Sequence, residues 1–123
     1  MIGEPKRVDP RATVRLPAEL HRGDATEWTK VMLQDLSVSG AAVHTRSHVP
    51  PQTEVRIRFR LPCEAGHQET QVEIECLAVR SGPLIPSNRG FAFFVGLHFL
   101  TLRGENFERV RGFVWGRLGR TSP

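Results

Sequence analysis

The stretch that decides the fold is EVRIRFRL, residues 54–61. Apolar and charged residues alternate strictly along it. The apolar members of the alternation are Val55, Ile57, Phe59 and Leu61. Because successive side chains of a β-strand point to opposite faces, the pattern predicts a strand with one face on a core and the other in water. Such half-buried strands are typical of antiparallel sheets.

Five further strands are predicted on either side of this one. They span residues 12–20, 28–36, 41–45, 70–80 and 91–100. The strand 70–80 places Val72, Ile74, Cys76, Ala78 and Arg80 on one face by parity. The segment 81–90 has two prolines and two glycines, so we expect a loop there.

The pattern changes in the last part of the chain. In residues 104–118 apolar side chains recur at steps of three and four, at Phe107, Val110, Val114 and Leu118. This spacing predicts an amphipathic helix that packs one stripe onto an apolar surface. Together these elements predict a mainly β fold: a six-stranded antiparallel barrel with a C-terminal α-helix that plugs one end or covers a sheet face.

Bulk composition limits where the protein works and what it binds. Seventeen Lys and Arg against thirteen Asp and Glu give a net charge of +4, which favours anionic partners. The first ten residues contain no apolar signal-peptide core, and no apolar run approaches the roughly 20 residues of a membrane helix. Two cysteines without metal-ligand spacing suit a reducing compartment. We expect a cytoplasmic protein without membrane insertion, as a monomer or weak homodimer.

The first candidate binding motif precedes the first predicted strand. Arg7 and Arg11 form an RxxxR motif, with Lys6 directly before it. A guanidinium is planar and permanently charged, so it can grip a phosphate or the acceptor edge of guanine and can stack on a purine. Pro10 disfavours a helix here and keeps the segment extended. A second RxxxR ends at Arg15, but this residue falls within the strand 12–20 and is expected to be an exposed strand residue.

The second candidate motif is the turn between the second and third strands. It contains Asp35, Ser37 and Gly40 in the pattern DxSxxG. A carboxylate can accept hydrogen bonds from the N1–H and N2–H₂ edge of guanine, and a hydroxyl can bond phosphate or ribose. Glycine permits a positive φ or a close backbone approach. The two motifs together suit a ligand that carries both two negative charges and guanine.

An RxxxR motif ahead of the first strand, followed by DxSxxG, resembles the signature of PilZ domains. A Gly-x-x-Phe segment, residues 96–99, and the helix that follows extend the resemblance to residues 6–118. The resemblance implies a six-stranded barrel that binds the second messenger cyclic di-GMP, is not an enzyme and uses no cofactor. It also implies an effector protein as partner, in motility, exopolysaccharide or adhesion machinery.

The resemblance also implies a role for each motif residue. Arg7 and Arg11 would grip phosphates and guanine faces, with Lys6 as a possible further contact where the family often has an arginine. Asp35 and Ser37 would contact guanine and the phosphate region, and Gly40 would keep the turn open.

The same reasoning predicts how the chain is divided. Residues 1–11 are expected to form a flexible arm, 12–118 the barrel domain with its helix, and 119–123 a tail. Ligand binding would order the arm against the barrel and so change the affinity for the partner.

Two other functions remain open from the sequence. The chain could be a PilZ-like scaffold that binds proteins and no nucleotide. It could also be a basic nucleic-acid-binding barrel, for which the best support is the stripe Arg56, Arg58 and Arg60. The chain has no tyrosine, and its tryptophans are not interleaved with the basic residues, so stacking platforms for single strands are lacking. No His or Cys spacing predicts a metal site, and no catalytic motif is present.

Overall fold

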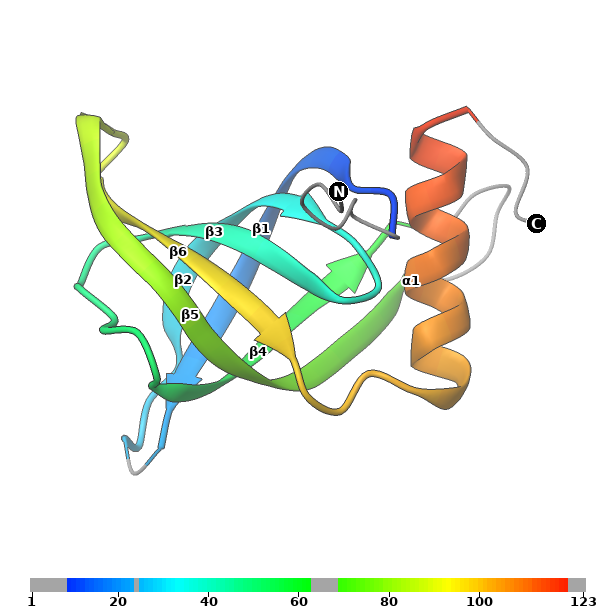
Figure 1. The fold of residues 1–123 in the computed structure, drawn as a ribbon, viewed down its shortest axis with the longest axis horizontal. Helices are drawn as coiled ribbons and strands as arrows, with labels where there is room; N and C mark the ends of the chain where they lie inside the picture. Colours follow the sequence, from blue (N-terminus) through cyan, green and yellow to red (C-terminus); the bar gives the residue numbers. More distant parts are fainter. Residues whose placement is uncertain (1–8, 24, 63–68, 120–123) are drawn as a thin grey trace, which may run out of the picture.

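The computed structural model describes residues 9–23, 25–62 and 69–119. Within these residues it contains six β-strands and one α-helix (Figure 1). The strands are β1 (Ala12–Arg22), β2 (Thr29–Leu36), β3 (Gly40–Thr45), β4 (Glu54–Leu61), β5 (Thr70–Asn88) and β6 (Phe91–Phe99). The helix is α1 (Gly104–Arg117). The predicted order of elements is confirmed.

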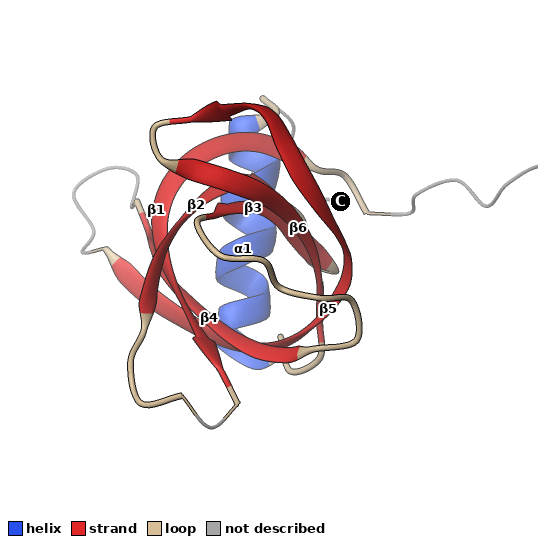
Figure 2. Cartoon of the chain, turned by 90° about the vertical axis from the view of Figure 1, so that its left-hand side faces the viewer, coloured by secondary structure: helices blue, strands red, loops and turns tan. Residues whose placement is uncertain are grey.

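All six strands pair antiparallel and form a closed barrel in the order β1-β2-β3-β6-β5-β4. Pairing of β1 with β4, for example Ala18 opposite Phe59, closes the ring. In Figure 2 the strands encircle the centre of the view and α1 lies behind them, across one end of the barrel. The predicted six-stranded barrel with a terminal helix is therefore confirmed.

The interior of the barrel is filled by the apolar members of each alternation. In β4 the four predicted residues are all buried: Val55, Ile57, Phe59 and Leu61. They pair in register with β5, where Ile57 faces Ile74 and Phe59 faces Val72. The strand pattern thus predicted which residues form the core.

The middle of the predicted helix stripe also reaches this core. Val110 and Val114 are fully buried, while Phe107 and Leu118 are half-buried. Gly119, directly after the C-cap Leu118, has a φ of +68°, and its N–H donates to the carbonyl of Gly116. A glycine at this left-handed position ends the helix without steric cost. Among the described residues, no helix is both long and apolar enough to cross a membrane.

The prediction of a loop at residues 81–90 is wrong. β5 continues to Asn88 and pairs with β6 through Ser81, Gly82 and Pro83, so the two strands form a ribbon that projects beyond the barrel. In this part β5 no longer pairs with β4, whose pairing ends at Leu77. An edge strand tolerates proline because the missing N–H would not have donated to a neighbour.

Candidate functional site

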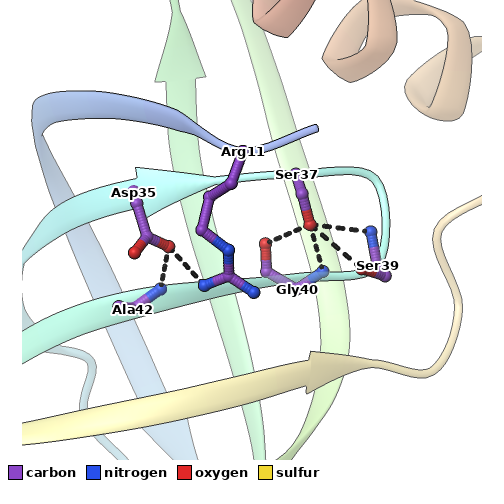
Figure 3. Close-up of polar contacts among 6 residues, drawn as sticks. All are labelled: Arg11, Asp35, Ser37, Ser39, Gly40 and Ala42. Carbon is purple, nitrogen blue, oxygen red and sulfur yellow. Dashed lines mark hydrogen bonds and ion pairs between the residues drawn. The ribbon is translucent and has the colours of Figure 1, made fainter. Parts of the chain in front are cut away.

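The two sequence motifs meet on the outside of the barrel. Nη1 of Arg11, just before β1, donates to Oδ1 of Asp35 on β2 at 2.6 Å (Figure 3). The same oxygen accepts a 3.0 Å hydrogen bond from the backbone N–H of Ala42 on β3. Asp35 and Ala42 also face each other in the β2–β3 register. One carboxylate therefore fixes the position of the arginine relative to two strands.

This ion pair is largely shielded from water. The side chains of Arg11 and Asp35 are 22% and 26% exposed. Nε of Arg11 is buried and has no hydrogen-bond partner among the described residues. A buried N–H without a partner is costly, and such groups are rare in folded proteins. Both bonds to Asp35 use Oδ1, so within the described chain its Oδ2 is still available to accept from a ligand.

The hydroxyl of Ser37 holds the turn between β2 and β3. Ser37 is fully buried, and its Oγ accepts from the backbone N–H groups of Ser39 at 3.2 Å and Gly40 at 3.1 Å. The same Oγ lies 3.0 Å from Oγ of Ser39 and 3.3 Å from the carbonyl oxygen of Gly40. These bonds account for the serine at this position: it sets the backbone of the turn next to the ion pair.

Gly40 is needed for a close backbone approach. A Cβ at this position would collide with the carbonyl oxygen of Leu97 on β6. Gly40 faces His98 in the β3–β6 register, and its φ is not positive. The expected requirement for glycine therefore has a packing reason in this structure.

Two of the predicted site residues, Lys6 and Arg7, lie outside the described residues. Arg15, the end of the competing RxxxR, is an exposed residue within β1, as expected. Of the six candidates, the structure brings together Arg11, Asp35, Ser37 and Gly40 at one end of the β2–β3 hairpin (Figure 3).

The sequence reasoning missed two residues beside this group. Gly96 of β6 faces Ala42 across the β3–β6 pair, and the side chain of Arg80 on β5 lies over Gly96. Parity had placed Arg80 with the core residue Ala78, but Arg80 is exposed. The available signal was the charge itself, since an arginine closing a run of apolar positions is poorly suited to a core.

His44 lies further along the same outer face of β3. Burial lowers the pKa of this histidine, and its Nδ1 has no hydrogen-bond partner in the described chain. Burial therefore favours the neutral form of this imidazole. The fixed positive charge at this face comes from arginine.

A small cavity of about 190 Å³ lies between the arm, the turn and α1. Its lining includes Pro10, Val38, Phe107, Val114 and Trp115. Trp115 is half-buried at this cavity. A larger cavity, about 900 Å³, opens between β1, β2 and β4 and is lined by none of the predicted site residues.

The arginine stripe of β4 is neutralised by its neighbours. Arg58 donates to Glu19 at 2.9 Å and lies 3.9 Å above the ring of Trp28. Arg56 lies 3.6 Å from both Glu73 and Glu75. This wall of the barrel presents alternating charge, which is poorly suited to a polyanion. Among the described residues, no cluster of His, Cys, Asp or Glu could hold a metal ion.

The family model of the PilZ domain matches residues 5–115, which include both motifs. This chain is a PilZ domain. The match covers most of the sequence, including all six strands and most of α1.

Solved structures show the same PilZ fold. The inhibitor of motility MotI (DgrA) of Bacillus subtilis is 17% identical, with a TM-score of 0.76 over 93% of this chain and 52% of that protein. This chain therefore spans about half the length of MotI. The PilZ domain of YcgR from Escherichia coli, solved with c-di-GMP, is 8% identical with a TM-score of 0.70, over 94% and 93% of the two chains.

A third structure is the PilZ domain of CeSA from a cellulose-synthesizing bacterium. It is 20% identical with a TM-score of 0.57, over 86% of this chain and 95% of that one. No curated protein matches the sequence of this PilZ domain.

Proposed function

We propose that this PilZ domain is a cytoplasmic, non-enzymatic receptor that binds cyclic di-GMP and passes the signal to a partner protein. Family membership supports this function, and so does the similarity to the YcgR PilZ domain, whose structure was solved with c-di-GMP. Motility and exopolysaccharide production are the processes suggested by the structural relatives MotI and CeSA.

The observation that carries the proposal is the contact between Arg11 and Asp35. The two residues are 24 positions apart, and each motif alone is common, but they meet in a 2.6 Å ion pair. A guanidinium beside a carboxylate with a free oxygen can bind phosphate on one side and the N–H edge of guanine on the other. A cyclic guanine dinucleotide offers both groups within one molecule.

The other motif residues would then divide between contact and support. Arg7, with Lys6 as a further contact, would close over the ligand from the arm. Ser37 and Gly40 would act chiefly by holding the turn, because the Ser37 hydroxyl is already engaged and Gly40 packs on β6. Ordering the arm costs about 1–2 kcal/mol per residue, which several charge-assisted bonds must offset. The ordered arm would present a new surface to the partner.

Isothermal titration calorimetry with cyclic di-GMP tests the proposal. We expect micromolar or tighter binding by the wild-type chain and at least a tenfold loss in Arg7→Ala, Arg11→Ala and Asp35→Ala. Arg109→Ala on α1 is the matched control, because this arginine pairs with Glu105 on the helix surface. GMP and cyclic di-AMP should bind more weakly than cyclic di-GMP.

If titration of the wild-type chain gives no heat of binding, the receptor function is wrong. The alternative that remains is a scaffold that binds proteins and no nucleotide. Equal binding of cyclic di-AMP would contradict the guanine-recognising role of Asp35.

A further inference from the structure

On the outer face of the barrel beside the ion pair, three neighbouring positions carry no large side chain of their own. β3 contributes Gly40 and Ala42, and β6 contributes Gly96, which faces Ala42 across the strand pair. We call these three residues the shelf. Neighbouring strands lie about 5 Å apart, so the shelf is a floor of backbone atoms and one methyl group.

Arg80 reaches the shelf because of a β-bulge in β5. Ala78 faces the core residue Leu97, but the register shifts between Ala78 and Arg80, so that Arg80 faces Gly96. Val79 is the extra residue of the bulge. Without the bulge, Arg80 would point into the barrel like Ala78; with it, Arg80 points to the outer face. Bulges often occur next to binding sites, where they redirect a side chain in this way.

The side chain of Arg80 lies flat across β6. Its Cγ and Nε are 2.9 and 3.0 Å from the place where a Cβ on Gly96 would stand. Any larger residue at 96 would displace it. The position of the Arg80 side chain therefore depends on glycine at position 96.

The charge of Arg80 has no counterion among the described residues, whereas Arg11 is paired with Asp35. In Figure 3 the guanidinium of Arg11 lies over β3. The side chain of Arg80 lies over Gly96 on the next strand, β6. Two guanidinium groups thus approach the shelf from opposite sides. Only one of them is neutralised.

We propose that Arg80 is a further ligand-binding residue of this PilZ domain, which contacts the dianionic nucleotide from the β5 side while Arg11 contacts it from the arm side. The inference rests on the proposed function, since it assigns a residue to the same site. It predicts that one ligand spans the shelf from β3 to β5.

Titration of cyclic di-GMP into Arg80→Ala and Arg80→Gln tests this inference. We expect about a tenfold or greater loss of affinity in both, because each removes a charge-assisted contact. Arg89→Ala is the control, because Arg89 is an exposed arginine at the turn of the same ribbon, away from the shelf. Thermal unfolding should be unchanged in all three variants, since both arginines are exposed.

Gly96→Ala provides a second test that keeps every charge. The added methyl occupies the place of the Arg80 stem, so we expect a several-fold weaker complex. Affinity within twofold of wild type in both Arg80→Ala and Arg80→Gln would overturn the inference and leave the receptor function standing. If the wild-type chain itself does not bind, both proposals fail together.

Discussion

Gly40 and Gly112 both lie in regular secondary structure, yet only Gly40 lacks room for a side chain. A Cβ at Gly40 would meet the backbone oxygen of Leu97, whereas nothing lies within 4 Å of one at Gly112. We expect Gly40→Ala to lower the free energy of unfolding by about 1–3 kcal/mol, the usual cost of overpacking. Gly112→Ala should raise it by about 0.5–1 kcal/mol through helix propensity. Urea unfolding measures both, and equal effects would contradict the packing argument.

Cys76 makes stability depend on alkaline pH. Burial raises the pKa of its thiol from 9.0 to about 12. Below pH 9 the thiol is protonated in the folded and unfolded states alike, so it adds no pH dependence. Between about pH 9 and 12 only the unfolded chain loses this proton, so the free energy of unfolding falls as pH rises. The chain has no tyrosine to titrate in the same range. Chemical unfolding across this range should show a shallower slope in Cys76→Ala.

For single residues, the sequence predicted which of them belong to the candidate site better than it predicted what each one contacts. The two motifs were expected to meet around one ligand, but the direct ion pair between Arg11 and Asp35 was not predicted. The burial of Ser37 could not be predicted, since turn serines are commonly exposed. The outward direction of Arg80 depends on a bulge that parity cannot reveal.

Among the elements, the β5–β6 ribbon is where the sequence was most misleading. Two prolines and two glycines predicted a loop, but all four lie in or beside an edge pair that needs few of their N–H groups. The alternation of β4, in contrast, was fully informative, because β4 pairs with a strand on each side and buries one face in the core. Periodicity predicts strands well where one face is buried and poorly where a ribbon leaves the core.

The projection of this ribbon gives a further prediction. Ile85 near its tip is 84% exposed, whereas Ile74 in the barrel part of the same strand is 1% exposed. Ile85→Ala should change the free energy of unfolding by less than about 0.5 kcal/mol, and Ile74→Ala should lower it by about 2–5 kcal/mol. Urea denaturation of the two variants provides the comparison. A large loss in Ile85→Ala would mean that the tip packs on another part of the chain.

For the whole molecule, charge is divided between two walls of the barrel. The wall around β4 carries ion pairs, while residues 36–53 and 76–104 contain no Asp or Glu. The triple variant of Arg56, Arg58 and Arg60 to alanine should therefore bind cyclic di-GMP within about twofold of wild type. Salt-sensitive binding of mixed oligonucleotides that is lost in this variant would instead favour a nucleic-acid-binding barrel. Fluorescence anisotropy with labelled oligonucleotides decides between the two.

The strand order has a consequence for synthesis. β6 is the last strand along the chain, yet it lies between β3 and β5. While the chain emerges from the ribosome, β1-β2-β3 and β4-β5 can form as two partial sheets, joined through β1 and β4. The edges of these sheets at β3 and β5 stay unpaired until residues 91–99, which form β6, have been synthesised. Because such distant pairings form slowly, the nascent chain exposes two unpaired strand edges, which are prone to aggregation, until β6 inserts. The shelf forms only at that step, because Gly96 lies on β6.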